Sequence, residues 1–134
     1  MDVVDIAGRV LFAFVFFQNG YRQLAQRTNM VAYAKSFGAP FPELSVPVTG
    51  VVMLAGGALL VLGVWPDLAV LALALFLVSA ALVAHRYWVE TDFGMRAGQE
   101  AHFYKNIALA GACLVMFAYF QNFSDAPGLG GTLF

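Results

Sequence analysis

Charged residues divide this chain into long uncharged runs. No charged residue occurs between Glu43 and Asp67, and none occurs between Asp67 and Arg86. A helix rises about 1.5 Å per residue, so about 20 residues cross a hydrocarbon core roughly 30 Å thick. Each run is therefore long enough to cross a bilayer as a helix, the structure that satisfies its own backbone hydrogen bonds in lipid.

The same reasoning predicts four spans, at about residues 3–24, 45–65, 68–88 and 101–120. The first and fourth have short apolar parts, residues 10–21 and 107–120. The first span must therefore take Arg9 into the outer part of the bilayer. The predicted fold class is all-α, an integral membrane bundle of four transmembrane helices that forms one domain over residues 1–134.

The first loop predicts a short helix of its own. In TNMVAYAKSFG, Thr28 is a candidate N-cap and Gly38 a candidate stop, while Val31, Ala34 and Phe37 fall on one face. We expect an interfacial helix at about residues 28–37, with a plain loop as the alternative. The two prolines of the following APFPEL favour an extended path.

Prolines and glycines predict the remaining connections. Pro47 falls in the first turn of the second span, where a missing N–H is tolerated. WPD is a tight turn, so the second and third spans should be antiparallel neighbours, and Asp67 is a candidate N-cap. The Gly-rich tail, residues 123–134, is expected to be flexible unless a partner holds it.

Basic residues predict the orientation in the membrane. The first and third loops share one side, which carries Arg22, Arg27, Lys35, Arg86, Arg96 and Lys105. The other side carries only Arg9, so the positive-inside rule places both termini outside a plasma (inner) membrane that the chain crosses several times. The predicted span ends also carry the aromatic residues of an interfacial belt, Tyr21, Trp65, Tyr87, Trp88 and Tyr104.

Composition agrees with a membrane protein and excludes other classes. The 134 residues are 61% hydrophobic and 11% charged, and the net charge of −1 offers no basic field for nucleic acid. The single cysteine, Cys113, rules out an intrachain disulfide and multi-thiolate metal centres. It lies in an apolar run and is interpreted as a core residue.

Small residues at helical spacing predict helix packing faces. Close backbone approach in lipid depends on such residues. The candidates are Gly50, Gly57, Gly56 and Gly63 in the second span, Ala80 and Ala84 in the third, and Ala108 and Ala112 in the fourth. Internal packing is the first interpretation, and contact with another protein is the alternative.

Arg9 has two interpretations. Asp5 lies four residues earlier on the same face, so the pair can form and Arg9 can extend toward the outer surface. Alternatively, Arg9 faces the bundle interior and holds an anion, such as a lipid phosphate, a quinone oxygen or a carboxylate of a partner.

Two histidines form a second candidate cluster. His85 ends the third span and His102 begins the antiparallel fourth, so the two side chains could meet. Lys105 and Asn106 follow on the same stretch, where Asn106 is expected to bond a neighbouring helix. Proton relay is conceivable, but no HxxxH or HxxE spacing supports a metal, and we predict none.

Other chemistry is not indicated by the sequence. Gln18 and Asn19 are expected to form interhelical hydrogen bonds. No Ser–His–Asp set, phosphate-binding loop or paired acidic dyad is present, so no catalytic residue is assigned.

Several segments together resemble the DoxX family of small four-helix membrane proteins. They are GRVLFAFVFFQNG, YAKSFGAPFPE, PVTGVVMLAGGALLVLG, LALFLVSAALVAHRYW and HFYKNIALAGACL. The resemblance implies a compact four-helix bundle whose polar positions are Arg9, Gly20, His85, His102, Lys105 and Asn106. The family often has a lysine shortly after the glycine of the first motif, where this chain has Gln23.

The resemblance implies several activities. Family members are linked to thiosulfate:quinone oxidoreduction, to thiol and oxidative-stress assemblies, and to accessory roles beside larger membrane proteins. We therefore expect an accessory or scaffold subunit of a respiratory, thiol-redox or lipid-transport complex, without a cofactor of its own. A quinone-linked oxidoreductase subunit is the alternative, in which Arg9, His85, His102 and Lys105 orient a quinone. A small-solute transporter ranks third, because the middle of the second and third spans contains only small and aliphatic residues.

Overall fold

The described part of the chain folds into helices joined by short connections. The computed structural model describes residues 2–123 and 125–134. The elements are α1 (Asp2–Ala25), α2 (Arg27–Ser36), α3 (Pro42–Leu62), α4 (Pro66–Ala84), the 3-10 helix η1 (Tyr87–Val89) and α5 (Phe93–Asn122). Within these residues, four helices are long and apolar enough to cross a membrane, supplied by α1, α3, α4 and α5. The predicted all-α fold class with four spans is confirmed.

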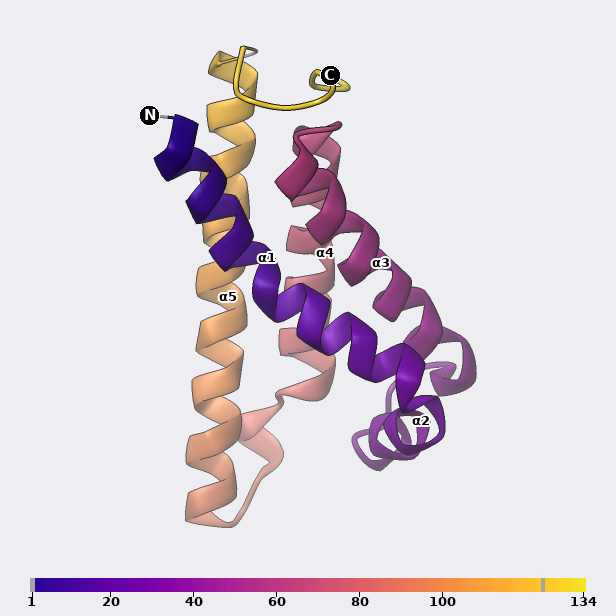
Figure 1. The fold of residues 1–134 in the computed structure, drawn as a ribbon. Coiled ribbons are helices and arrows are strands. Elements are labelled where there is room, and N and C mark those ends of the chain that lie inside the picture. Colours follow the sequence, from indigo (N-terminus) through magenta and orange to yellow (C-terminus); the bar gives the residue numbers. More distant parts are fainter. Residues whose placement is uncertain (1, 124) are drawn as a thin grey trace.

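The helices form a bundle with two different ends (Figure 1). One end holds both termini and is called the terminal end below, and the other holds α2 and the α4–α5 connection and is called the loop end. α1 packs along α3, α4 packs along α5, and α3 joins the two pairs through α4. α1 runs obliquely across the bundle, so its second half lies with α3 and α2 at the loop end.

The turn between α3 and α4 follows directly from its sequence. Gly63 has a φ of 64°, and the N–H of Val64 donates to the carbonyl of Leu59 at 3.0 Å. This is a glycine-terminated helix end, and Pro66 then begins α4 with its preset φ. The two helices are neighbours, as the WPD turn predicts.

Three predicted helix starts are displaced in the structure. α3 begins at Pro42, so Pro47 lies inside the helix and the prolines do not give a long extended segment. Trp65 precedes α4, so Asp67 is a residue of its first turn and not its N-cap. α2 begins at Arg27, one residue before Thr28, because the backbone of Gln26 continues the hydrogen bonding of α1 into α2 without a side-chain cap.

α2 packs against the start of α3 through the predicted face. Val31 and Ala34 are buried with Val46, and Phe37 is partly buried beside them. The short helix is therefore present with the expected packing, and its place at a membrane surface stays a prediction.

α5 is longer than the predicted fourth span. It begins at Phe93, where the Asp92 carboxylate caps it by accepting the N–H of Met95 at 3.0 Å. Its 30 residues correspond to about 45 Å, against about 30 Å for the hydrocarbon core. The first turns of α5 therefore lie beyond the apolar part of the spans, at the loop end.

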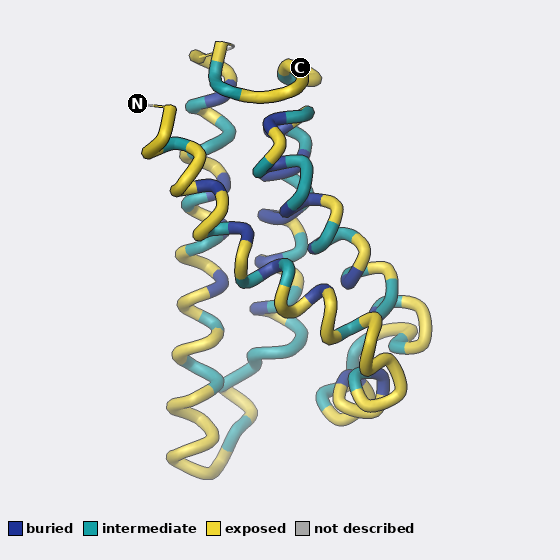
Figure 2. The backbone as a smooth tube through the Cα atoms, in the orientation of Figure 1, coloured by how far each residue is buried: buried dark blue, intermediate teal, exposed yellow. Residues whose placement is uncertain are grey.

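The core lies where the four long helices meet (Figure 2). Its fully buried side chains come from every long helix and include Phe16, Met53, Leu60, Leu73, Cys113 and Phe120. Cys113 is a core residue, as predicted. Outward-facing positions carry large apolar side chains such as Leu11, Phe14 and Leu75, which suit lipid as their surroundings.

Glycines set the spacing between α1 and α3. A Cβ added to Gly20 would lie 2.9 Å from the Gly50 carbonyl oxygen, so the two backbones are in direct contact. Gly57 faces the ring of Phe17 in the same interface, and Gly56 instead faces Leu73 of α4. The glycines of the second span therefore serve internal packing on two sides.

The alanines predicted to pack are placed differently. On α4 the fully buried alanines are Ala69 and Ala81, while Ala80 and Ala84 are only half-buried. On α5 the buried face holds Ala110, and Ala112 is half-buried while Ala108 is exposed. Of the four predicted alanines, Ala108 alone lies on an exposed face, and the most buried alanines of these helices are others.

We predict that Gly20→Ala lowers the thermal stability of the purified protein. The added methyl would meet a carbonyl oxygen of α3 that cannot move aside, and overpacking of this kind costs about 1–3 kcal/mol. The measurement is the melting temperature in detergent, followed by size-exclusion chromatography.

The matched control is Gly111→Ala, because nothing lies within 4 Å of a Cβ added there. It should melt at or slightly above the wild-type temperature, since alanine is the better helix former. Equal melting temperatures for the two variants would show that the α1–α3 approach is not tight.

Candidate functional site

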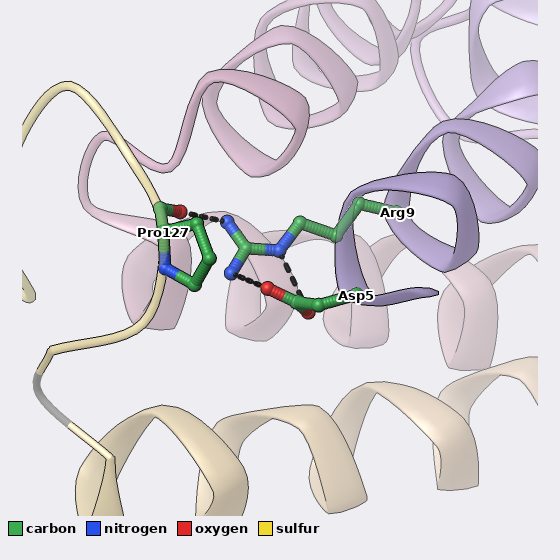
Figure 3. Close-up of polar contacts among 3 residues, drawn as sticks. All are labelled: Asp5, Arg9 and Pro127. Atoms are coloured by element: carbon green, nitrogen blue, oxygen red, sulfur yellow. Dashed lines mark hydrogen bonds and ion pairs between the residues drawn. The ribbon is translucent and has the colours of Figure 1, made fainter. Parts of the chain in front are cut away.

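Arg9 is buried at the terminal end beside Asp5 (Figure 3). Its Nε donates to one carboxylate oxygen of Asp5 at 3.1 Å, and Nη2 donates to the other. The arginine is only 3% exposed, so water does not compensate its charge. The i, i+4 spacing predicts this ion pair, and the paired carboxylate makes burial of the guanidinium tolerable.

Two further groups complete the surroundings of Arg9. Nη1 donates to the carbonyl of Pro127 at 2.8 Å, and the guanidinium lies over the ring of Phe120, 4.9 Å from its centroid. The guanidinium is therefore bound by α1, by α5 and by the C-terminal tail. It faces the interior of the bundle, and its partners there are groups of this chain.

The C-terminal tail crosses the end of the α3–α4 pair. We call residues 127–134 the strap. The N–H of Leu129 donates to the carbonyl of Leu62 at 2.9 Å, and the N–H of Trp65 donates to the carbonyl of Gly131 at 3.1 Å. These hydrogen bonds lie along the turn that ends α3. Gly128 also lies so close to Gly63 that a Cβ on Gly63 would be 2.5 Å from its Cα.

Asp67 anchors the end of the strap. Its carboxylate accepts the N–H of Leu133 at 2.9 Å and the N–H of Phe134 at 2.8 Å, and the residue is 0% exposed. We expect a flexible tail over residues 123–134 from its composition, of which residue 124 lies outside the described residues, whereas residues 127–134 are hydrogen-bonded to α1, α4 and the α3–α4 turn. The physical reason is that a buried carboxylate requires donors, and the strap supplies them from its backbone, which composition cannot reveal.

A second polar site is a cleft at the loop end. Its volume is 480 Å³, within the range of small-molecule sites, and all five α-helices contribute to its walls. The polar lining residues are Asn19, Arg22, Gln23, Ser45, Thr49, Ser79, His85, Gln99, His102, Lys105 and Asn106. The apolar ones include Val15, Phe16, Met53, Phe76, Leu77 and Leu109.

Polarity changes along the cleft in the same direction on each long helix. On α4 the lining passes from Phe76 and Leu77 to His85, a rise of about 14 Å. On α1 it passes from Phe16 to Arg22 in the same direction. The end of the cleft toward the middle of the bundle is therefore apolar. The loop end carries the basic and amide side chains, together with apolar residues of α2 and of the start of α3 such as Ala34, Phe37 and Val46.

The two histidines meet at the polar end of the cleft, as predicted. The rings of His85 and His102 stack with centroids 5.1 Å apart and an interplanar angle of 29°. Nδ1 of His85 lies 2.8 Å from Oε1 of Gln99, and Nζ of Lys105 lies 3.4 Å from Nδ1 of His102. A neutral His85 that donates through Nδ1 and a neutral His102 that accepts from the lysine satisfy both contacts.

The predicted polar residues do not form one cluster. His85, His102, Lys105 and Asn106 line the cleft together. Arg9 is bound to the strap instead and does not line the cleft, so it cannot orient a ligand there. A headgroup held jointly by Arg9 and the histidines is therefore excluded by the geometry.

The interhelical hydrogen bond of α1 was assigned to the wrong residues. Gln18 is exposed, and Asn19 donates to the carbonyl of Val15 in its own helix. The bond to α3 comes from Gln23, whose Oε1 accepts from the hydroxyl of Thr49 at 2.7 Å. The sequence indicates this hydrogen bond only weakly. Gln23 and Thr49 are polar residues that fall near the same end of their two helices.

Sequence reasoning also missed Gln99 and Arg22 as cleft residues. Gln99 precedes His102 by three residues, so both lie on one face of α5, but the predicted span began after it. Within the described residues, no group of three or more His, Cys, Asp or Glu side chains is placed to hold a metal ion.

Comparison with known families supports the same architecture. A family model described as DoxX matches residues 4–86, more than half of the chain. The chain belongs to the DoxX family. Together with its four long apolar helices, this makes it a multi-pass membrane protein. The motif HFYKNIALAGACL lies beyond the matched residues. No curated protein and no solved structure matches the chain.

We predict that Asp67→Ala releases the strap of this DoxX protein. The substitution removes the acceptor of the Leu133 and Phe134 N–H groups, and hydrogen bonds to a charged group contribute about 1.5–3 kcal/mol. Backbone amides of the strap should then exchange with deuterium at least tenfold faster, as measured by mass spectrometry.

The control is Asp125→Asn, because this exposed carboxylate precedes the strap. It should leave exchange of the strap amides unchanged. Equal exchange rates in Asp67→Ala and wild type would show that the carboxylate does not anchor the strap.

Proposed function

We propose that this protein is an accessory subunit of a larger membrane complex and that it holds an amphiphilic molecule for that complex in the loop-end cleft. The observation that carries the proposal is the change in polarity along the cleft. An amphiphile has a polar headgroup and an apolar chain, and the cleft offers a polar end next to Lys105 and an apolar end next to Phe76. Hydrophobic walls with a few placed polar groups are typical of ligand sites.

The proposal places the loop end at the cytoplasmic face. Six of the seven basic residues belong to the loops and helix ends there, and the positive-inside rule supports this orientation. The polar end of the cleft then lies at headgroup depth, and its apolar end reaches into the hydrocarbon. An amphiphile can enter sideways from the bilayer without leaving its own depth.

A partner subunit is supported by the outward face of α5. Ala108 and Gly111 are exposed there, and nothing lies within 4 Å of a Cβ added to Gly111. Small residues on a lipid-facing helix surface permit a second transmembrane helix to approach closely. The alternative interpretation of the Ala108–Ala112 spacing, contact with another protein, is therefore the one we propose.

We predict that Ala108→Leu weakens association with a partner. The tagged protein, captured in mild detergent, should bring down a membrane protein in near-equal amount, and the bulkier side chain should reduce that yield at least tenfold because it separates the helices. The measurement is quantitative mass spectrometry of the captured proteins.

Ala55→Leu is the control, an exposed alanine on α3 away from the α5 face. It should retain the partner at the wild-type level. Recovery of the wild-type protein alone, with no partner at comparable yield, would contradict the accessory role.

A second candidate function is a quinone-linked oxidoreductase subunit, which the stacked imidazoles favour. Quinone carbonyl oxygens accept hydrogen bonds, and His102, Lys105 and Asn106 offer donors at the polar end of the cleft. The lining residues therefore fit a quinone headgroup, which would supply two-electron redox chemistry when bound. The residues of this chain would orient the headgroup and hold a proton at His85 or His102, and a partner subunit would exchange the electrons.

The test of this candidate is extraction of bound quinone from the purified protein. The quinone-linked role predicts a stoichiometric ubiquinone or menaquinone that falls at least tenfold in His102→Ala. Arg9→Lys should retain it, because Arg9 lies outside the cleft. Quinone absent from active wild-type preparations would remove this candidate.

A further inference from the structure

The charges around the cleft are of one sign. Arg22 and Lys105 line it, together with the imidazoles of His85 and His102. No aspartate or glutamate belongs to the described residues that line the cleft. Arg22 and Lys105 are thus two cations of the lining without an opposing carboxylate there, which favours an anionic occupant.

The cations of the cleft are not neutralised by ion pairs. Within the described residues, the ion pairs are Arg9 with Asp5 and Lys35 with Glu43. Arg22 and Lys105 belong to neither pair. Two other basic residues near the loop end do not line the cleft and donate to backbone carbonyls, Arg27 to that of Glu43 and Arg86 to that of Phe37.

Neutral donors accompany these cations. Gln23, Gln99 and Asn106 lie in the same lining, and the buried Asn106 lies one residue beyond Lys105 on α5. A phosphate group offers several strong acceptor oxygens and takes charge-assisted hydrogen bonds from arginine and lysine together with bonds from amides and hydroxyls. The mixture at the polar end matches that acceptor.

The apolar end determines what must be attached to the phosphate. Val15, Phe16, Phe76, Leu77 and Leu109 continue the cleft away from the charged groups. A free phosphate would leave these side chains uncovered, whereas an acyl chain would cover them. The bilayer supplies molecules that join an anionic phosphate to acyl chains.

We propose that the loop-end cleft is a binding site for an anionic phospholipid of the bilayer, with its headgroup at the end lined by Arg22, Lys105 and the two histidines and one acyl chain along the apolar wall. This rests on the proposed function for occupation of the cleft by an amphiphile, and it adds the charge of the headgroup. Zwitterionic phospholipids and quinones carry no net negative charge and bind less well.

The test is lipid competition on the purified full-length protein. The protein is equilibrated in mild detergent with equal amounts of phosphatidylglycerol and phosphatidylcholine that have identical acyl chains, and retained lipid is measured by native mass spectrometry. The wild type should retain phosphatidylglycerol preferentially. A basic residue near an anionic lipid surface contributes about 1 kcal/mol, so Arg22→Gln and Lys105→Gln should each lower the preference about fivefold.

Two variants make the test specific to the cleft. Arg96→Gln removes a positive charge from α5 at the same end, but Arg96 does not line the cleft and lies over the Tyr87 ring. It should leave the preference unchanged. Ala80→Phe fills the wall of the cleft and should reduce retention of both lipids, provided that size-exclusion chromatography shows a monodisperse protein.

Four outcomes would overturn the proposal. The first is equal retention of the two lipids by the wild type. The second is an effect of Arg96→Gln as large as that of Arg22→Gln, which would indicate the general field of the surface. The third is displacement of the lipid by inorganic phosphate alone. The fourth is a bound quinone in place of phospholipid, which would leave the proposed amphiphile-holding function intact. Retention of no amphiphile at all would contradict both the phospholipid site and the proposed function.

Discussion

The close approach of α1 to α3 is the contact on which the shape of the molecule depends. Gly20 and Gly50 bring the two backbones together in the second half of α1. A helix is a stiff rod over this length, so a half that is drawn toward α3 is drawn away from α5. The loop-end cleft occupies the space that this divergence leaves, with α4 behind it. The two glycines of the α1–α3 contact thereby help to set the space between α1 and α5.

The bundle handles its polar groups differently at its two ends. At the terminal end, Arg9 and Asp67 are buried and each is satisfied by groups of the same chain, including the backbone of the strap. At the loop end, Arg22 and Lys105 face a cleft in which no carboxylate of the described chain opposes them. The first arrangement is closed and suits a structural role. The second is open and suits recognition of a molecule from outside.

The length of the uncharged runs was the most informative feature of the sequence, because a helix needs about 20 such residues to cross the hydrocarbon core. It gave the second and third spans directly, and the antiparallel order of the third and fourth was enough to bring His85 to His102. Predictions from neighbouring residues were wrong where contacts with distant residues determine the role of a side chain. Asp67 has the sequence context of an N-cap, but its partners are 66 and 67 residues away. Ala108 has the spacing of a packing residue, but helix rotation places it outside.

The arrangement of polar and apolar residues around the cleft could not be predicted from the sequence alone. The sequence identifies His85, His102, Lys105 and Asn106 as a candidate cluster, but their relation to the rest of the lining exists only once five helices are placed around one space. Arg22 is an example, because at the end of a span the sequence indicates only a basic residue at the membrane interface. Only the fold shows that it faces the same space as Lys105.

The strap also constrains the order in which the protein assembles. A ribosome releases α1, α3 and α4 before residues 127–134 exist, so the partners of Arg9 and Asp67 at the strap arrive after these helices have entered the membrane. Until then, two charged side chains at the terminal end lack part of their hydrogen bonding. Closure of the terminal end therefore requires that the strap has been synthesised, and it links α1 and α4 to residues 127–134.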